Sequence, residues 1–196
     1  MGTPFTTMFS AAEDPISEYG RWVNNALDFW TPVQTIVGRA YGTNGAKDTY
    51  DDSFAHLQGY GPNVQIIGII HRAGGIPAGE THEIELLHRF SSLTGRARGY
   101  EFNLNYLGSM QAVRWNGAPG DFTVLSGGGS VSIASGDEYK VRISGTTASV
   151  YYNNNLIYTQ TGLTDYSDGN PGIGFFKRVA GTNDVFGFSS ITVTPL

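Results

Sequence analysis

Turn-forming residues interrupt this chain at short intervals, and this feature constrains its fold more than any other. Gly, Asn, Asp or Pro closes one short run of β-branched and aromatic residues after another along all 196 residues. No window of ordinary helix length keeps apolar residues at a 3.6-residue period. Short runs with this spacing are typical of the strands of a sandwich or barrel. The sequence therefore predicts an all-β protein.

The expected strands cover most of the chain. They are Thr35–Tyr41, Tyr50–Gln58, Val64–Arg72, His82–Phe90, Gly99–Leu107, Gln111–Asn116, Phe122–Leu125, Tyr139–Ser144, Ala148–Tyr152, Leu156–Gln160, Gly172–Arg178 and Val185–Val193. A tight reversal is expected at Asn153–Asn155, because asparagine tolerates positive φ. The run Gly127–Gly129 is typical of an irregular connection, and Asp14–Leu27 has room for a helical turn. Since no linker, charge block or repeat divides the chain, we expect residues 1–196 to form a single domain.

Charge and cysteine content exclude several classes of function. The chain has no cysteine, so disulfides and thiolate chemistry are absent. Its formal net charge is −5, with Lys and Arg scattered along the sequence, which argues against a nucleic-acid partner and an anionic membrane surface. The longest apolar run, Ile66–Ile70, is too short to insert into a membrane. The N-terminus also lacks the pattern of a signal peptide.

Four segments, taken in order, resemble the concanavalin A-like lectin and glucanase superfamily and its laminin G-like domains. They are Phe9–Ser17 with the following Gly20–Trp22, Asp137–Val141 leading into Val150–Asn154, Gly169–Phe176, and Phe186–Val193. The resemblance implies a two-sheet antiparallel jelly-roll sandwich, with paired chain ends and one curved sheet whose concave face holds carbohydrate. The superfamily includes lectins, glucanases, uronate lyases and noncatalytic modules, so the fold alone does not choose a function.

The most polar of the expected strands is His82–Phe90. Alternation predicts Glu83, Glu85 and Arg89 on one face and Phe90 on the other. Glu83 and Glu85 resemble the start of the glucanase pattern Glu-x-Asp-x-x-Glu, but His88 stands where the second catalytic carboxylate belongs. The two glutamates are about 7 Å apart on an extended strand, which is closer to an inverting than a retaining spacing. A salt-bridged polar sheet face explains the same residues without catalysis.

The next expected strands supply further polar and aromatic groups. Glu101 and Asn103 fall on one face of their strand, and Arg114 and Trp115 follow on the next. Sugars need hydrogen bonds to paired hydroxyls and an aromatic ring against a C–H face. The predicted ligand-binding residues are therefore Glu83, Glu85, Arg89, Glu101, Asn103, Arg114 and Trp115, with no catalytic residue assigned.

These residues support one leading function and two alternatives. The leading hypothesis is a noncatalytic, lectin-like carbohydrate-binding domain on the concave face. The first alternative is a polysaccharide-cleaving enzyme on the same face, either a glycoside hydrolase or a uronate lyase. Candidate lyase groups are His71, Arg98, Tyr100, Arg114 and Lys177. The second alternative is a structural or adhesive component of a virion or cell surface, which would self-associate or dock onto a particle. The sequence does not fix the location of the protein, and we expect an extracellular or virion-surface one.

No cofactor is expected, and no residues have the spacing of an established metal site. His82 and His88 are about 20 Å apart on an extended strand and cannot share a zinc ion. Calcium needs only hard oxygen ligands, for which Glu13, Asp14 and the pair Asp51 and Asp52 are the candidates.

Overall fold

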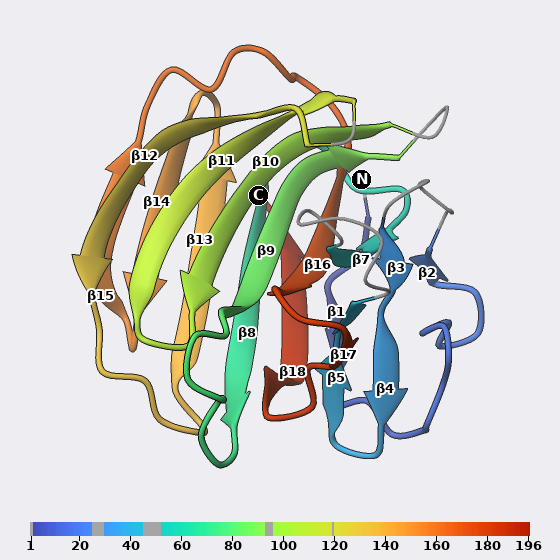
Figure 1. Ribbon diagram of the computed structural model, residues 1–196. Coiled ribbons are helices and arrows are strands. Elements are labelled where there is room, and N and C mark those ends of the chain that lie inside the picture. The colour runs from blue at the N-terminus through green and yellow to red at the C-terminus, as the bar shows by residue number, and fades with distance from the viewer. Residues whose placement is uncertain (1, 25–29, 45–51, 93–95, 119) are drawn as a thin grey trace.

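The computed structural model describes residues 2–24, 30–44, 52–92, 96–118 and 120–196. These residues form two eight-stranded sheets, packed face to face, and a separate two-stranded ribbon (Figure 1). Nowhere among them is there a helix long and apolar enough to cross a membrane. The all-β, two-sheet sandwich predicted from the sequence is confirmed.

One sheet, which we call the β8 sheet, contains both ends of the chain. Its strands are β15 (Asn155–Gln160), β14 (Thr147–Tyr152), β13 (Glu138–Ser144), β8 (Val64–Arg72), β18 (Phe186–Pro195), β5 (Arg39–Tyr41) and β4 (Gln34–Ile36), in that order, with β1 (Phe5–Thr7) beside β18. Phe5 of β1 pairs with Val193 of β18. The chain ends are thus paired, as the resemblance implied.

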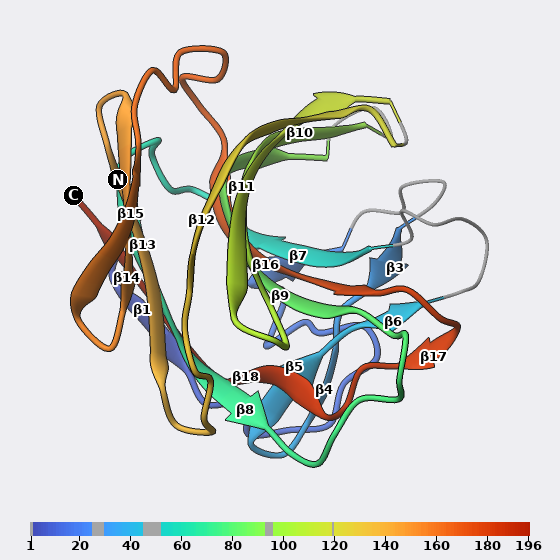
Figure 2. The same ribbon diagram turned by 60° about the vertical axis from the view of Figure 1, so that its left-hand side comes forward.

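The other sheet, the β9 sheet, is strongly curved. Its order is β12 (Phe122–Ser130), β11 (Ser109–Gly117), β10 (Ala97–Asn105), β9 (His82–Ser91), β16 (Asn170–Lys177), β7 (Ser53–Leu57) and β2 (Trp22–Val23), with β3 (Thr31–Pro32) parallel to β7. The ribbon consists of β6 (Thr43–Asn44) and β17 (Gly181–Thr182). Figure 2 shows the sheet bent into an arc at β10 and β11, with its hollow facing away from the β8 sheet. This hollow is the concave face.

The main hydrophobic core lies between the two sheets. Alternate residues of each sheet, such as Ile66 of β8 and Phe102 of β10, point into it and are fully buried. A second, smaller cluster covers part of the concave face. It consists of Trp30, Phe54, Leu87, Phe90, Ala97, Val113 and Trp115, with Phe122 packed against it. Because both faces of β9 are covered, most of its polar side chains are buried, among them Glu85, His88 and Arg89.

Several strands differ from the sequence prediction for local reasons. The run Thr35–Tyr41 reverses at Gly38, whose φ is +84°, and forms the β4–β5 hairpin instead of one strand. Strand β12 continues through Gly127–Gly129, which we expected to be an irregular connection. The reversal at Asn153 and Asn154 is confirmed, with φ of +47° and +64°.

Parts of two predictions lie outside the described residues. The expected strand Tyr50–Gln58 begins before residue 52, and its described part contains β7. The expected helical turn Asp14–Leu27 reaches into residues 25–29, and its described part holds a turn and β2.

Candidate functional site

A cavity of about 180 Å³ opens on the concave face of the β9 sheet. Neighbouring strands place side chains side by side on this face: Asn103 pairs with Glu85, and Glu101 pairs with Leu87. The residues that line the cavity are Asp52, Glu83, Glu85, Glu101, Asn103, Gln111, Val113, Trp115, Phe122 and Phe176. Acidic, amide and aromatic groups therefore meet in one hollow.

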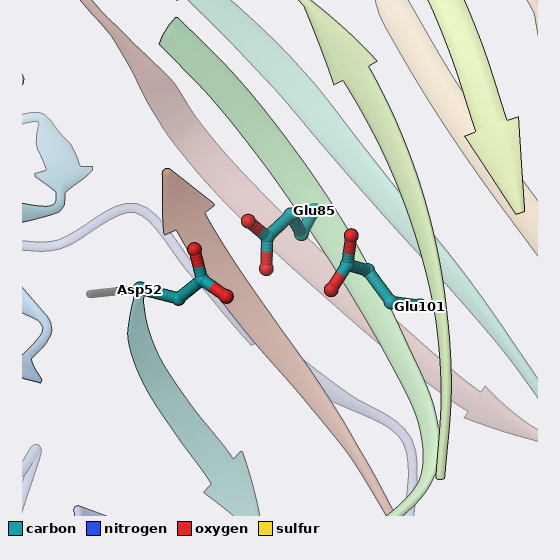
Figure 3. Close-up of side chains that lie close together, drawn as sticks. All are labelled: Asp52, Glu85 and Glu101. Atoms are coloured by element: carbon teal, nitrogen blue, oxygen red, sulfur yellow. The ribbon is translucent and has the colours of Figure 1, made fainter. Parts of the chain in front are cut away.

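Three carboxylates converge at the centre of this site (Figure 3). Asp52 immediately precedes β7, while Glu85 lies on β9 and Glu101 on β10. One carboxylate oxygen from each residue lies within 4.8 Å of the others. The three residues are only 5%, 1% and 3% exposed, respectively. We call them the acidic cluster.

Two members of the acidic cluster differ sharply in their hydrogen bonds. Glu101 is held on both oxygens, because Asn103 Nδ2 donates to Oε1 at 2.9 Å and Trp115 Nε1 donates to Oε2 at 2.6 Å. Glu85 has no hydrogen-bond partner for either oxygen among the described residues. A buried carboxyl without a partner is costly, so native proteins seldom keep one without a reason.

Burial makes these carboxyls reluctant to ionise. Desolvation raises the pKa of Glu85 well above its usual range, and the charges of Glu101 and Asp52 raise it further. Burial likewise raises the pKa of Glu83 to about 8, with the charge of Glu101 adding to the effect. The pKa of Glu101 is also raised by burial, against the opposing effect of its hydrogen bonds from Trp115 and Asn103. Burial and the neighbouring acidic groups therefore favour the protonated forms of these carboxyls, and a bound cation would favour the ionised forms.

A glycine on the adjacent strand makes room for the unpartnered carboxylate. Gly174 of β16 pairs with Glu85 in the sheet. A Cβ atom at position 174 would lie only 2.1 Å from Oε2 of Glu85. Any larger residue at this position would displace the carboxylate from the acidic cluster.

The predicted placement of Arg89 on the same face as Glu83 and Glu85 is wrong, because β9 contains a bulge. Arg89 has a φ of +49°, and the register with β10 shifts so that Ser91 pairs with Arg98 while His88 pairs with Tyr100. The extra residue reverses the alternation that follows. Phe90 therefore joins the concave cluster, and Arg89 points away from the cavity.

The Arg89 side chain instead ties together loops at one end of the sandwich. Its guanidinium group donates hydrogen bonds to the backbone carbonyls of Pro62, Gly145, Leu163 and Tyr166 and to Oδ1 of Asn63. These acceptors satisfy a buried cation without a carboxylate. The placement of Arg89 points to a structural role.

Arg114 is also separated from the cavity, because adjacent residues on a strand point to opposite faces. Trp115 lies on the concave face and lines the cavity, whereas Arg114 forms an ion pair with Asp165 at 2.8 Å. Its Nε also donates to Oδ1 of Asn116. Arg114 and Trp115 were both predicted to contact the ligand, but only Trp115 lines the cavity.

The structure brings five of the seven predicted site residues together, namely Glu83, Glu85, Glu101, Asn103 and Trp115. Sequence reasoning missed Gln111, Val113, Phe122 and Phe176 as lining residues, and it considered Asp52 only as a calcium ligand. Phe122 begins the expected strand that follows Gln111–Asn116, and the structure pairs it with Trp115. Pairing these two neighbouring strands in a hairpin was the one clue in the sequence to its position. Nothing local in the sequence indicated that the residue preceding β7 would meet β9 and β10.

The other calcium candidates are engaged in local contacts. The carboxylate of Glu13 accepts hydrogen bonds from the backbone amides of Ser17 and Glu18, and Asp14 accepts one from Gln34. Asp51 lies outside the described residues. Calcium binding at these positions stays a prediction from the sequence.

No protein-family model and no curated protein sequence matches this chain, but solved structures do. The carbohydrate-binding module CBM66 from Bacillus subtilis has 15% sequence identity and a TM-score of 0.59, over 92% of this chain and 96% of that one. A Bacillus licheniformis β-glucanase has 14% identity and a TM-score of 0.60, over 100% and 99%. LamAcat from Zobellia galactanivorans has 16% identity and a TM-score of 0.56, over 97% and 96%.

These similarities identify the fold as the concanavalin A-like jelly roll that the resemblance implied, while the likeness to laminin G-like domains stays a prediction. A binding module and a β-glucanase stand together among the similar structures. The shared fold therefore does not separate carbohydrate binding from carbohydrate cleavage.

Proposed function

We propose that this chain is a lectin-like domain that binds carbohydrate in the cavity on the concave face of the β9 sheet. The observation that carries the proposal is the meeting of polar groups and aromatic rings in one hollow. Glu83, Asn103 and Gln111 offer hydrogen-bonding groups for sugar hydroxyls, while Trp115 and Phe122 offer rings for the C–H faces of a sugar.

The charge of the cavity favours glycans without acidic groups. Its described lining contains four carboxyl groups and no Arg, Lys or His. A uronate would therefore place a further acidic group beside buried carboxyls, and no basic residue in this lining could neutralise it. The five candidate lyase residues, His71, Arg98, Tyr100, Arg114 and Lys177, all lie outside the lining. This arrangement supports a neutral or cationic sugar.

A binding panel tests this proposal. We expect isothermal titration calorimetry to detect binding of at least one uncharged or cationic oligosaccharide and none of the uronate oligomers. Gln111→Ala should weaken that binding about tenfold, since it removes a polar contact at the mouth of the cavity. Gln65→Ala, on β8 in the other sheet, is the matched control and should leave affinity unchanged. Equal loss in both variants, or binding confined to uronates, would contradict the proposed site.

A second candidate function, cleavage of a glycosidic bond, is favoured by the spacing of Glu85 and Glu101. Their nearest oxygens lie within 4.8 Å, close to the roughly 5–5.5 Å separation of retaining glycosidases. Burial also favours one protonated carboxyl, which could donate a proton to the leaving oxygen while an ionised neighbour attacks the anomeric carbon.

Product analysis on the same panel separates the two functions. New reducing ends that disappear in both Glu85→Gln and Glu101→Gln would assign catalysis to this pair. Binding without products would leave the lectin-like function. The absence of both binding and products would favour the structural or adhesive alternative.

A further inference from the structure

The unpartnered carboxylate of Glu85 points into the acidic cluster, towards Asp52 and Glu101 (Figure 3). Glu85 is 1% exposed, and neither of its oxygens has a hydrogen-bond partner among the described residues. Glu101 already accepts hydrogen bonds from Asn103 and Trp115, so its oxygens are held in place. The acidic cluster therefore contains one buried carboxylate, that of Glu85, without a hydrogen-bond partner among the described residues. A bound cation would supply that partner and neutralise the buried charges.

The spacing of the acidic cluster fits the donors of a primary ammonium group. Such a group carries three N–H donors in a tetrahedral arrangement, and each charge-assisted N–H···O contact is about 2.8 Å long. Three acceptors placed around one nitrogen in this way are separated by about 4.6 Å. The oxygens of Asp52, Glu85 and Glu101 lie within 4.8 Å of one another. One ammonium nitrogen can therefore contact all three carboxylates.

The surroundings of the cluster favour an organic cation over a bare metal ion. A single water molecule needs only about 10–15 Å³ of cavity volume, whereas this cavity offers about 180 Å³. Its walls include the rings of Trp115, Phe122 and Phe176, which are no ligands for calcium or magnesium. Trp115 also donates directly to Glu101, so an aromatic wall adjoins the charged centre.

We infer that the cavity selects an amino sugar, with the ammonium group held by Asp52, Glu85 and Glu101 and the sugar ring packed against the aromatic wall. This inference rests on the proposed carbohydrate-binding function and names the class of ligand. A glucosamine residue meets the requirement, because it presents a primary ammonium group on a pyranose ring. N-acetylation removes both the charge and two of the three donors, so the acetylated sugar should not bind in this way.

Three matched trisaccharides test the inference by isothermal titration calorimetry near neutral pH and at physiological salt. The β-1,4-linked trimers of glucosamine, N-acetylglucosamine and glucose share one backbone and differ only in the group at C2. We expect the glucosamine trimer to bind at least tenfold more tightly than either of the others. Similar affinities for all three would overturn the amino-sugar inference while still supporting carbohydrate binding. Binding of none of them would count against both proposals.

A pair of variants that each replace one carboxyl by an amide separates the cluster from general attraction between an acidic protein and a cationic sugar. Glu85→Gln should reduce the preference for the glucosamine trimer to less than about twofold. Asp168→Asn makes the same chemical change at an exposed position and should leave the preference intact. A preference that survives Glu85→Gln, or is lost equally in Asp168→Asn, would contradict the inference. Thermal denaturation of each variant verifies folding, and Glu101→Gln provides a second test of the cluster.

The competing explanation is that the acidic cluster binds a metal ion, and titration with calcium in the absence of sugar tests it. We expect no binding heat that depends on Glu85, and an unchanged preference for the glucosamine trimer when calcium is present. Calcium binding that Glu85→Gln abolishes, together with no preference for the amino sugar, would assign the acidic cluster to a metal ion and overturn the inference.

Discussion

Glu85 and Arg89 lie four residues apart on one strand, and both are charged residues removed from water, yet the fold treats them in opposite ways. The Arg89 guanidinium group has acceptors from four backbone carbonyls and one asparagine. Glu85 has no hydrogen-bond partner among the described residues. Arg89 is thus a buried ionisable group that the fold satisfies and that holds loops of the sandwich together. Glu85 is a buried ionisable group whose hydrogen-bonding capacity the described residues leave unused, as expected at a binding site.

Replacing Arg89 gives the largest expected effect. Arg89→Met leaves a set of loop carbonyls without their donor and should lower the free energy of unfolding by about 3–5 kcal/mol. For a chain of this size, that corresponds to a fall in Tm of roughly 10 °C. Arg114→Met is the control, because its partly exposed ion pair with Asp165 should contribute less than about 1 kcal/mol. Equal losses in the two variants would show that Arg89 holds the loops no more firmly than a surface ion pair does.

His88, between the two contrasted residues, should make stability depend on pH. It is fully buried, neither ring nitrogen has a hydrogen-bond partner among the described residues, and burial lowers its pKa from 6.5 to about 3. Because protonation is easier in the unfolded chain, the contribution of neutral His88 is complete above pH 6.5 and is lost as the pH falls towards 3. His88→Leu should therefore gain about 2 kcal/mol relative to the wild type between pH 7 and pH 5.

Comparing His88→Leu with the wild type is essential, because the cavity carboxyls act in the opposite direction. The pKa of Glu83 rises from 4.5 to about 8 on folding, so its neutral form stabilises the fold at low pH and the contribution is lost as the pH rises through 8. Urea denaturation at a series of pH values gives both curves. A constant difference between the two proteins would show that His88 does not titrate as its burial implies.

Removing the unpartnered carboxylate of Glu85 should change stability less than Arg89→Met does, and should increase it. Glu85→Met replaces a buried polar group by an apolar one of similar size and should raise the free energy of unfolding by about 1–2 kcal/mol. Binding of the glycan should be lost at the same time, which is the trade-off expected at a functional site. Urea denaturation and calorimetry on one preparation measure both quantities. A destabilised protein would mean that Glu85 contributes to the fold as Arg89 does.

The smallest expected effect tests how finely Glu85 is positioned. Gly174→Ala adds a methyl group where the Oε2 atom of Glu85 lies, so the carboxylate must turn away from the acidic cluster. Affinity for the glycan should fall about fivefold, close to 1 kcal/mol. Gly61→Ala, at a position with open space around its Cβ and no positive φ, provides the comparison for affinity. Unchanged affinity in Gly174→Ala would show that the cluster tolerates a displaced Glu85.

The sequence predicted the fold and much of the site because both depend on local alternation. Glu83 and Glu85 on one strand and Glu101 and Asn103 on the next follow the two-residue period, and the structure places all four in the cavity lining. Asp52 was not predicted to join them, because its position depends on β7 pairing with β16, a contact between segments far apart in the chain.

Arg89 was misplaced for a different reason. A two-residue period carries no sign of an inserted residue, and nothing in the run His82–Phe90 reveals where the pairing with β10 shifts. The position of Gly174 is significant only once Glu85 is seen beside it. Such features emerge from the register between strands and not from any one strand.

The bulge at Arg89 divides β9 into two parts whose side chains alternate in opposite phase. Residues before it and residues after it follow alternations of opposite phase, so a substitution in one half does not change which way the other half faces. If the same residues paired with β10 without the bulge, regular alternation would turn Phe90 away from the concave cluster and bring Arg89 to the cavity side of the sheet. One extra residue thus separates the part of β9 that lines the cavity from the part that holds the loops of the sandwich, so each part can change without the other.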